Sequence, residues 1–217
     1  LVWFWVSGAA NIAALLLADE AMRGGKVSIV APITSTEGAI AAVLAVATGE
    51  TLGAPSAVLL VVIVCGVVVA SRQPSGDVSH PFRSTLLAAG AACLFGLGLF
   101  STAKVSGVLP IAWAVLPPRL VGVGAVTLPL LASRRLRVPG AAWPLVLLSG
   151  CCEVLGFASY AEGSRHGIAV SAVLASQFAA LAAVGAFLLF HERLARVQLA
   201  GVAAIVVGVG VLSLLQA

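Results

Sequence analysis

Two carboxylates lie inside long apolar stretches, where acidic side chains are rare. Glu37 lies between the almost wholly apolar segments 27–33 and 39–47, and Glu153 lies near the middle of the apolar stretch 141–162. A charged side chain at the centre of a bilayer costs at least about 2.5–3.5 kcal/mol, and removal from water favours the protonated carboxyl. Both residues are therefore candidates for proton binding. The structural alternative is a protonated or hydrogen-bonded residue of helix packing.

Four more polar side chains occur within apolar stretches. Asn11, Ser35 and Gln177 are candidates either for lining a polar cavity or for interhelical hydrogen bonds, which contribute about 0.6 kcal/mol on average. Arg119 follows a Pro-Pro pair and is a candidate for contacting an anionic ligand group or for pairing with one of the two glutamates. A long basic side chain can equally extend to the lipid headgroups, so both alternatives stay open.

Glu50 and Glu192 lie at the ends of apolar stretches, just before the next helix is expected to begin. A carboxylate at such a position accepts backbone N–H groups and favours the positive end of the helix dipole. Both residues are therefore expected to set turns rather than to exchange protons.

The composition indicates an all-α polytopic membrane protein. Of the 217 residues, 61% are hydrophobic and 9% are charged, whereas soluble domains have about 25% charged residues. The apolar blocks have the length of about 17–25 residues that crosses a bilayer as a helix, and the alternation typical of a β-barrel is absent. The net charge of +4 lies mostly in short connections, which points to lipid headgroups rather than nucleic acid. The four cysteines form no Cys-x-x-Cys pattern, and no metal, cofactor or catalytic residue is expected.

Eight membrane-spanning helices are predicted from the apolar blocks and the Gly, Pro and basic residues between them. Only the connection near 72–83 is long, so the other successive helices are expected to be antiparallel neighbours. The predicted spans are 2–18, 27–48, 54–71, 84–103, 107–131, 141–162, 167–190 and 196–215.

An internal repeat relates the two ends of the sequence. With an offset of 142 residues, 8–71 aligns with 150–213 without a gap, so that Gly8 meets Gly150 and Glu20 meets Glu162. Asn11 then corresponds to Glu153, and Ser35 to Gln177. The second copy follows two further spans, so one unit has five helices, and two spans of an inferred ten are expected to precede residue 1. An odd number of helices per unit implies two inverted copies, an arrangement of transporters with a ligand site near the midplane.

This organisation divides the chain into three parts. Residues 1–71 are expected to form the last three helices of the first repeat, 72–83 a connecting loop, and 84–217 the second five-helix repeat.

Several segments resemble the EamA-type drug/metabolite transporter superfamily. They are the turns Glu50-Thr-Leu52 and Glu192-Arg-Leu194, with glycines in the helices that follow, and Pro118-Arg119, which is similar to an arginine in the second helix of a family unit. The sequence departs from the family where a helix-kinking Ser-Pro pair often precedes the turn glutamate, because Thr36-Glu37 and Phe178-Ala179 occupy those positions.

The resemblance implies a secondary transporter of the bacterial cytoplasmic (inner) membrane rather than an enzyme. It implies export of small metabolites, amino acids or drugs by alternating access, with proton or other ion coupling. The expected ligand contacts are Asn11, Ser35, Glu37, Arg119, Glu153 and Gln177, with Glu37 and Glu153 as the proton-binding pair. The alternatives are an intramembrane lipid-modifying enzyme, which would need clustered acids, histidines or metal ligands, and a non-transporting membrane scaffold.

Overall fold

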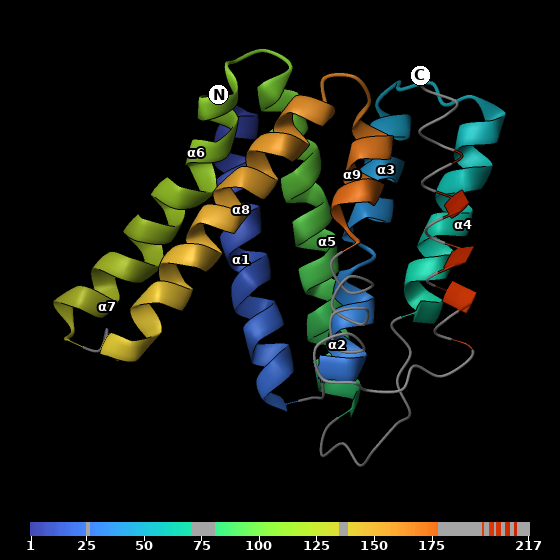
Figure 1. Ribbon diagram of the computed structural model, residues 1–217. Coiled ribbons are helices and arrows are strands. Elements are labelled where there is room, and N and C mark those ends of the chain that lie inside the picture. Colours follow the sequence, from blue (N-terminus) through green and yellow to red (C-terminus); the bar gives the residue numbers. More distant parts are fainter. Residues whose placement is uncertain are drawn as a thin grey trace.

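The computed structural model describes residues 1–24, 27–70, 81–134 and 139–177, and eight positions between 197 and 211 (197, 200, 201, 203, 204, 207, 208 and 211). Within these residues all regular structure is helical (Figure 1). Most of the predicted spans 167–190 and 196–215, most of the loop 72–83, and Glu192 lie outside the described residues.

Four helical segments among the described residues are long and apolar enough to cross a membrane, namely Val2–Arg23, Phe82–Ser106, Ile111–Ala132 and Gly140–Gly163. Three of them cover a predicted span and extend beyond it, namely the spans 2–18, 84–103 and 141–162. The segment Ile111–Ala132 begins four residues later than the predicted span 107–131 and ends one residue beyond it. Shorter apolar helices cover Glu37–Ala47 and Ala54–Gly66. The chain is therefore a helical protein with the character of a membrane protein.

The centre of the molecule is the contact between α1 (Val2–Gly24) and α5 (Pro81–Ser106). Small side chains make this contact possible: Ala14 and Ala21 of α1 and Ala88 and Ala91 of α5 are fully buried. Small residues let two helix backbones approach closely where lipid gives no hydrophobic driving force. At the lower end in Figure 1, the Ser84 hydroxyl on α5 donates to the Ala21 carbonyl over 2.8 Å and fixes the register.

The predicted span 27–48 is not one continuous helix. It consists of α2 (Val27–Thr34) and α3 (Glu37–Ala47), separated by a turn at Ser35 and Thr36. Three consecutive hydroxyls, those of Thr34, Ser35 and Thr36, donate to carbonyl oxygens of the preceding turn. Such local side-chain bonds compete with continued helix, so the Thr-Ser-Thr sequence gives a physical reason for the break. Glu37 is consequently the first residue of α3 and not the middle of a helix.

The span that contains Arg119 is also irregular. It comprises α6 (Ile111–Gly122), a π-helical turn η1 (Val123–Thr127) and α7 (Leu128–Ala132). Pro117 and Pro118 lie inside α6 and are buried. Proline removes a backbone donor and disturbs the helix ladder, and π-helical turns are frequent at functional sites.

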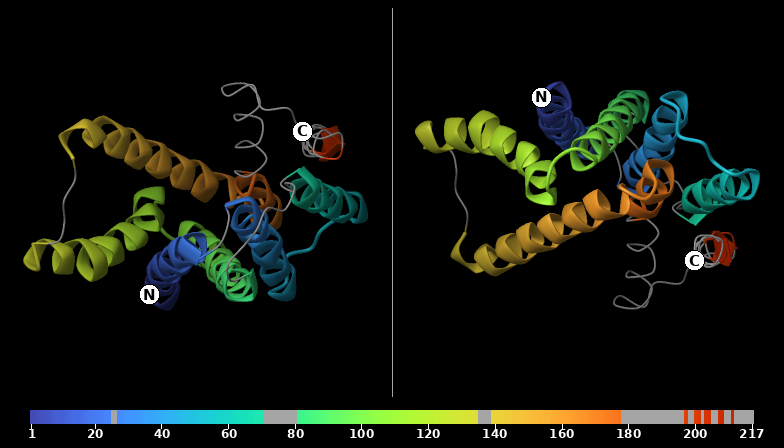
Figure 2. Two further views of the ribbon diagram at one scale, coloured as in Figure 1. Left: turned by 90° about the horizontal axis from the view of Figure 1, so that it is seen from below. Right: turned by 90° about the horizontal axis from the view of Figure 1, so that it is seen from above.

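The remaining helices complete two sides of the molecule. A short turn of 3₁₀-helix, η2 (Gly140–Ala142), leads into α8 (Trp143–Gly163), and α9 (Ile168–Ala175) and α4 (Ala54–Ala70) follow on the opposite side. Figure 2 shows α6, α7 and α8 on one side and α3, α4 and α9 on the other, with α1 and α5 between them. The turns near 48–53, 107–110 and 164–167 gather at the upper end in Figure 1.

Candidate functional site

A cavity of about 320 Å³ lies between α1, α6, η1 and α8. It contains three of the predicted site residues, Asn11 from α1, Arg119 from α6 and Glu153 from α8, and its other lining residues are mostly apolar. Two opposite charges and one amide therefore share a cavity within helices that are long and apolar enough to span a membrane.

Arg119 and Glu153 form an ion pair across this cavity, with 3.3 Å between Nη2 and Oε1. Arg119 also donates from Nη1 to the Val115 carbonyl over 3.3 Å, and its guanidinium carbon lies 4.7 Å from the centroid of the Phe157 ring. A cation over an aromatic face gains about 0.5–2 kcal/mol. In the structure Arg119 therefore pairs with Glu153, and its side chain is turned toward α8.

Gly8 allows α1 to approach the segment that positions Arg119. A Cβ atom at Gly8 would lie 2.7 Å from the Pro117 carbonyl oxygen and 2.8 Å from a Val121 methyl group. Backbone cannot yield as a flexible side chain does, so a larger residue would push α1 away from α6. The glycine therefore helps to hold the Asn11 helix against the Arg119 helix.

A second polar cluster lies where α3 crosses the end of α9. A Cβ atom at Gly38 would lie 2.4 Å from the Ala172 carbonyl oxygen and from the Ser176 hydroxyl, so the first turn of α3 directly contacts the last turn of α9. Gln177 is buried, its amide nitrogen donates to the Val173 carbonyl over 2.9 Å, and its Oε1 atom has no hydrogen-bond partner among the described residues.

Glu37 is partly buried at the start of α3. The first N–H groups of a helix lack partners within it, and the helix dipole is positive at this end. A carboxylate in the first turn offsets that partial charge. The helix break therefore gives a local reason for an acidic residue at this depth, which the sequence pattern did not reveal.

The six predicted contact residues thus occur in two groups and not in one. Asn11, Arg119 and Glu153 line the cavity. Ser35 and Gln177 are buried in the turns after α2 and α9, and Glu37 follows Ser35 by two residues, at the start of α3. These three residues are not part of the lining of the cavity around Arg119 and Glu153.

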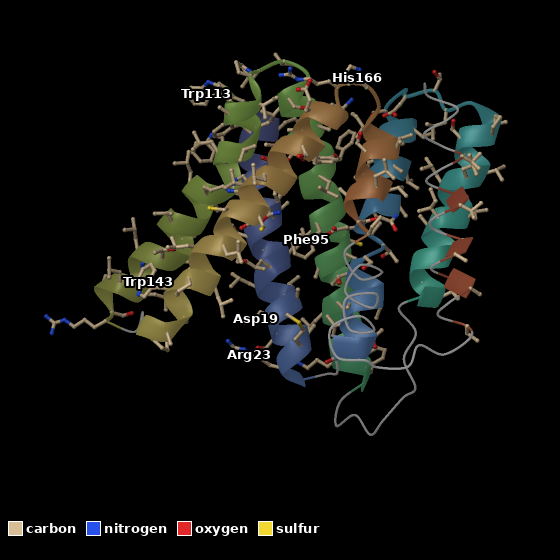
Figure 3. All side chains as sticks on the ribbon, in the orientation of Figure 1. Asp19, Arg23, Phe95, Trp113, Trp143 and His166 are labelled. Atoms are coloured by element: carbon tan, nitrogen blue, oxygen red, sulfur yellow. The ribbon has the colours of Figure 1, made fainter. Side chains whose placement is uncertain are left out.

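Aromatic residues of α6 and α8 have two kinds of surroundings. Tyr160 is buried and donates its hydroxyl to the Leu99 carbonyl of α5 over 2.9 Å. Trp113 is 51% exposed near one end of the α6–α8 pair, and Trp143 is equally exposed at the other end (Figure 3). Exposed tryptophans at both ends match the interfacial belts of membrane proteins.

Phe157, whose ring lies against the Arg119 guanidinium, was not among the predicted site residues. Its position four residues after Glu153 places it on the same helix face and could have indicated this role.

Glu50 forms a contact that its sequence position does not suggest. Its two carboxylate oxygens accept the backbone N–H groups of Ile168 and Ala169, each over 3.2 Å. These are the first residues of α9, whereas the helix that follows Glu50 in the chain is α4. Glu50 therefore accepts N–H groups from a helix that is distant in the sequence, and not from the helix that follows it. Glu192 lies outside the described residues.

The described residues contain no group of three His, Cys, Asp or Glu side chains able to hold a metal ion. The four cysteines are free and exposed.

Comparison with known proteins establishes the fold alone. No model of a known protein family matches the chain, and no curated protein sequence matches it. A protein of known crystal structure superposes with a TM-score of 0.75 over 98% of this chain and 86% of that chain, with 16% sequence identity. The arrangement of helices is therefore similar to one that occurs in an experimentally determined structure.

Proposed function

We propose that the chain is a secondary transporter that resembles the EamA-type drug/metabolite transporters. It would export small metabolites, amino acids or drugs across the bacterial inner membrane by alternating access. In this proposal residues 1–71 and 84–217 belong to two inverted repeats.

The main support is the ion pair of Arg119 and Glu153 inside the cavity between α1, α6 and α8. Ionisable residues within membrane spans are costly, pair with one another and commonly mark the pathways of substrates or ions. Arginine also binds carboxylates and phosphates through two parallel hydrogen bonds. A cavity with this pair and the Asn11 amide has the chemistry to bind a small polar ligand.

The positions of repeat-related residues support the inverted arrangement. Asn11 and Glu153, which correspond at the offset of 142, line the same cavity. Ser35 and Gln177, which correspond at the same offset, both lie in the turn that follows a short helix, α2 or α9. Interrupted helices are typical of transporter binding sites, and the break between α2 and α3 is of this kind.

Glu37 and Glu153 are the proposed proton-binding residues. Glu37 has no ion-pair partner among the described residues, whereas Glu153 has Arg119. The two carboxylates therefore have different surroundings, because Glu37 stands apart from the charged pair of the cavity and Glu153 is part of it.

The other classes of function receive less support. A scaffold needs no charged cavity, and a wholly apolar centre would suit it better. An intramembrane enzyme needs clustered acids, histidines or metal ligands, and no such trio occurs in the part of the chain that the structure describes.

An untargeted comparison of metabolites outside cells with and without the full-length protein tests the proposal. We expect one or a few compounds to accumulate outside cells that express the wild type. The double variant Arg119→Gln/Glu153→Gln should abolish this accumulation, and the variant Cys151→Ser, on α8 outside the cavity lining, should preserve it. Identical extracellular profiles for the wild type and the double variant, at equal expression, would contradict the proposed transport site.

A further inference from the structure

The two charges of the cavity are held to very different degrees. Arg119 is 24% exposed and is fixed by the Val115 carbonyl and by the Phe157 ring beneath it. Glu153 is 57% exposed, and its ion pair with Arg119 is the carboxylate's only polar contact with a described residue. The arginine is therefore the fixed partner, and the glutamate is free to leave.

The contact between them leaves an N–H donor group of the arginine without a hydrogen-bond acceptor. The Nη2 atom of Arg119 is buried and has no hydrogen bond of good geometry with a described residue, although Glu153 Oε1 lies 3.3 Å away. A guanidinium satisfies a planar anion through two parallel N–H donors at about 2.7–2.9 Å. A carboxylate that approaches squarely would therefore bind Arg119 better than Glu153 does.

The rest of the cavity limits the size and the polarity of the part of the ligand that is attached to the carboxylate. The volume of about 320 Å³ is at the small end of ligand cavities. Beside the charged pair the wall is formed by aliphatic side chains, among them Ile12, Leu15, Val123 and Val126. The amide of Asn11 is the additional polar group of α1 in this wall. A small carboxylate with a compact apolar part fits this combination.

We propose that Arg119 is the receptor for the carboxylate of a small, partly apolar monoanion, and that Glu153 is a built-in competitor which this anion displaces. The inference rests on the proposed transport function and specifies the class of substrate for the same site. Glu153 itself shows the mode of binding, because its own carboxylate occupies the position that the ligand would take.

Displacement leaves the Glu153 carboxylate without a counter-charge in the cavity. Arg119 is the one charged group that faces Glu153 from the cavity lining. Of the other helices packed against α8, α5 has its charges near its ends, at Arg83 and Lys104, and α9 has none within 168–175. The anion and Glu153 therefore compete for the same counter-charge, and this competition limits the affinity for the anion.

Thermal unfolding of the purified full chain in detergent tests this inference without any transport assay. Phenylacetate serves as the anionic probe, and 2-phenylethanol as a neutral control of similar shape. For the wild type, phenylacetate should raise the unfolding midpoint, and 2-phenylethanol should not. Glu153→Gln, which removes the competing charge, should bind phenylacetate at least about tenfold more tightly than the wild type does.

The arginine variants separate a binding role from a purely structural one. Arg119→Gln and the charge-balanced double variant Arg119→Gln/Glu153→Gln should both lose stabilisation by phenylacetate, and the double variant provides the test if the single one does not fold. The inference is overturned if Glu153→Gln binds no more tightly than the wild type, if the double variant binds equally well, or if 2-phenylethanol stabilises as strongly. Binding as predicted, without transport in vesicles, would instead contradict the proposed function.

Discussion

Single glycines determine how closely the helices of this protein approach. Gly38 lies at the crossing of α3 and α9, and Gly8 lies at the crossing of α1 and α6. In both places the nearest atom to an added Cβ would be a backbone oxygen of the neighbouring helix. Backbone cannot move aside without shifting a whole helix, so these contacts are more sensitive to substitution than the many exposed positions of α8.

Gly38→Ala is predicted to destabilise the protein by about 1–3 kcal/mol, the usual cost of overpacking, because its Cβ would lie 2.4 Å from the Ala172 oxygen. Gly150→Ala is the matched control, since no atom lies within 4 Å of its Cβ position. Alanine there should be neutral or stabilising by up to about 1 kcal/mol through helix propensity. Thermal unfolding of the two purified variants gives the comparison, and equal midpoints would contradict the crossing described here.

The ion pair of Arg119 and Glu153 leads to a second prediction for individual residues. Removing one partner leaves the other charge unpaired, whereas removing both leaves none. Arg119→Gln should therefore be less stable than the double variant Arg119→Gln/Glu153→Gln, even though the double variant has one more substitution. The unfolding midpoints of the two variants in detergent measure this difference in stability. A double variant that is less stable than Arg119→Gln would mean that Arg119 and Glu153 do not stabilise each other.

Helices of this fold are joined by bonds between distant parts of the chain. At the upper end in Figure 1, Glu50 caps α9, and the Ser106 hydroxyl lies 3.0 Å from that of Ser164. Arg165 donates to the Ser106 and Leu109 carbonyls, each over 3.0 Å, and so satisfies the end of α5 and the turn after it. These contacts hold the turns of one end together.

Glu50→Ala is predicted to lower the stability by about 1–3 kcal/mol, since the first N–H groups of α9 lose their acceptor. Hydrogen exchange should rise at Ile168 and Ala169 in particular, because the cap acts on α9. Thr51→Ala, at an exposed neighbouring position, is the control. Unchanged exchange in α9 would show that the cap has no energetic role.

Some elements and contacts follow from sequence and others do not. Apolar length predicted α1, α5 and α8, and Asn11 and Glu153, which correspond at the offset of 142 residues, line one cavity. The break before Glu37 is encoded locally by Thr34, Ser35 and Thr36, but hydroxyl residues also occur within continuous helices, so the pattern is ambiguous. The cap of α9 by Glu50 spans more than a hundred residues of sequence and depends on tertiary structure alone.

At the scale of the whole molecule, the structure defines two ends that would face opposite sides of a membrane. Thr51 and His166 lie in turns of the upper end, and Ser133 follows α7 at the lower end; His166 is labelled in Figure 3. The fold therefore predicts which positions share an aqueous phase.

Single cysteines at these exposed positions, in a variant whose four native cysteines are replaced by serine, test this arrangement. Thr51→Cys and His166→Cys should react with a membrane-impermeant maleimide from the same side of the membrane, and Ser133→Cys from the opposite side. Native Cys65 retained alone, within α4, is the control for labelling inside the bilayer. Reaction of all three positions from one side would contradict the membrane-spanning arrangement.

The most direct measurement of the central claim is proton-driven transport by the full-length protein in sealed vesicles. The substrate is the compound that accumulates outside expressing cells, and a pH gradient is imposed across the vesicle membrane. We predict that the gradient drives this compound across the membrane for the wild type and for Cys151→Ser, and that Glu37→Gln/Glu153→Gln no longer responds to it. An equal response of the wild type and this double variant would contradict proton coupling through the two carboxylates, and the absence of any movement with the folded wild type would contradict transport itself.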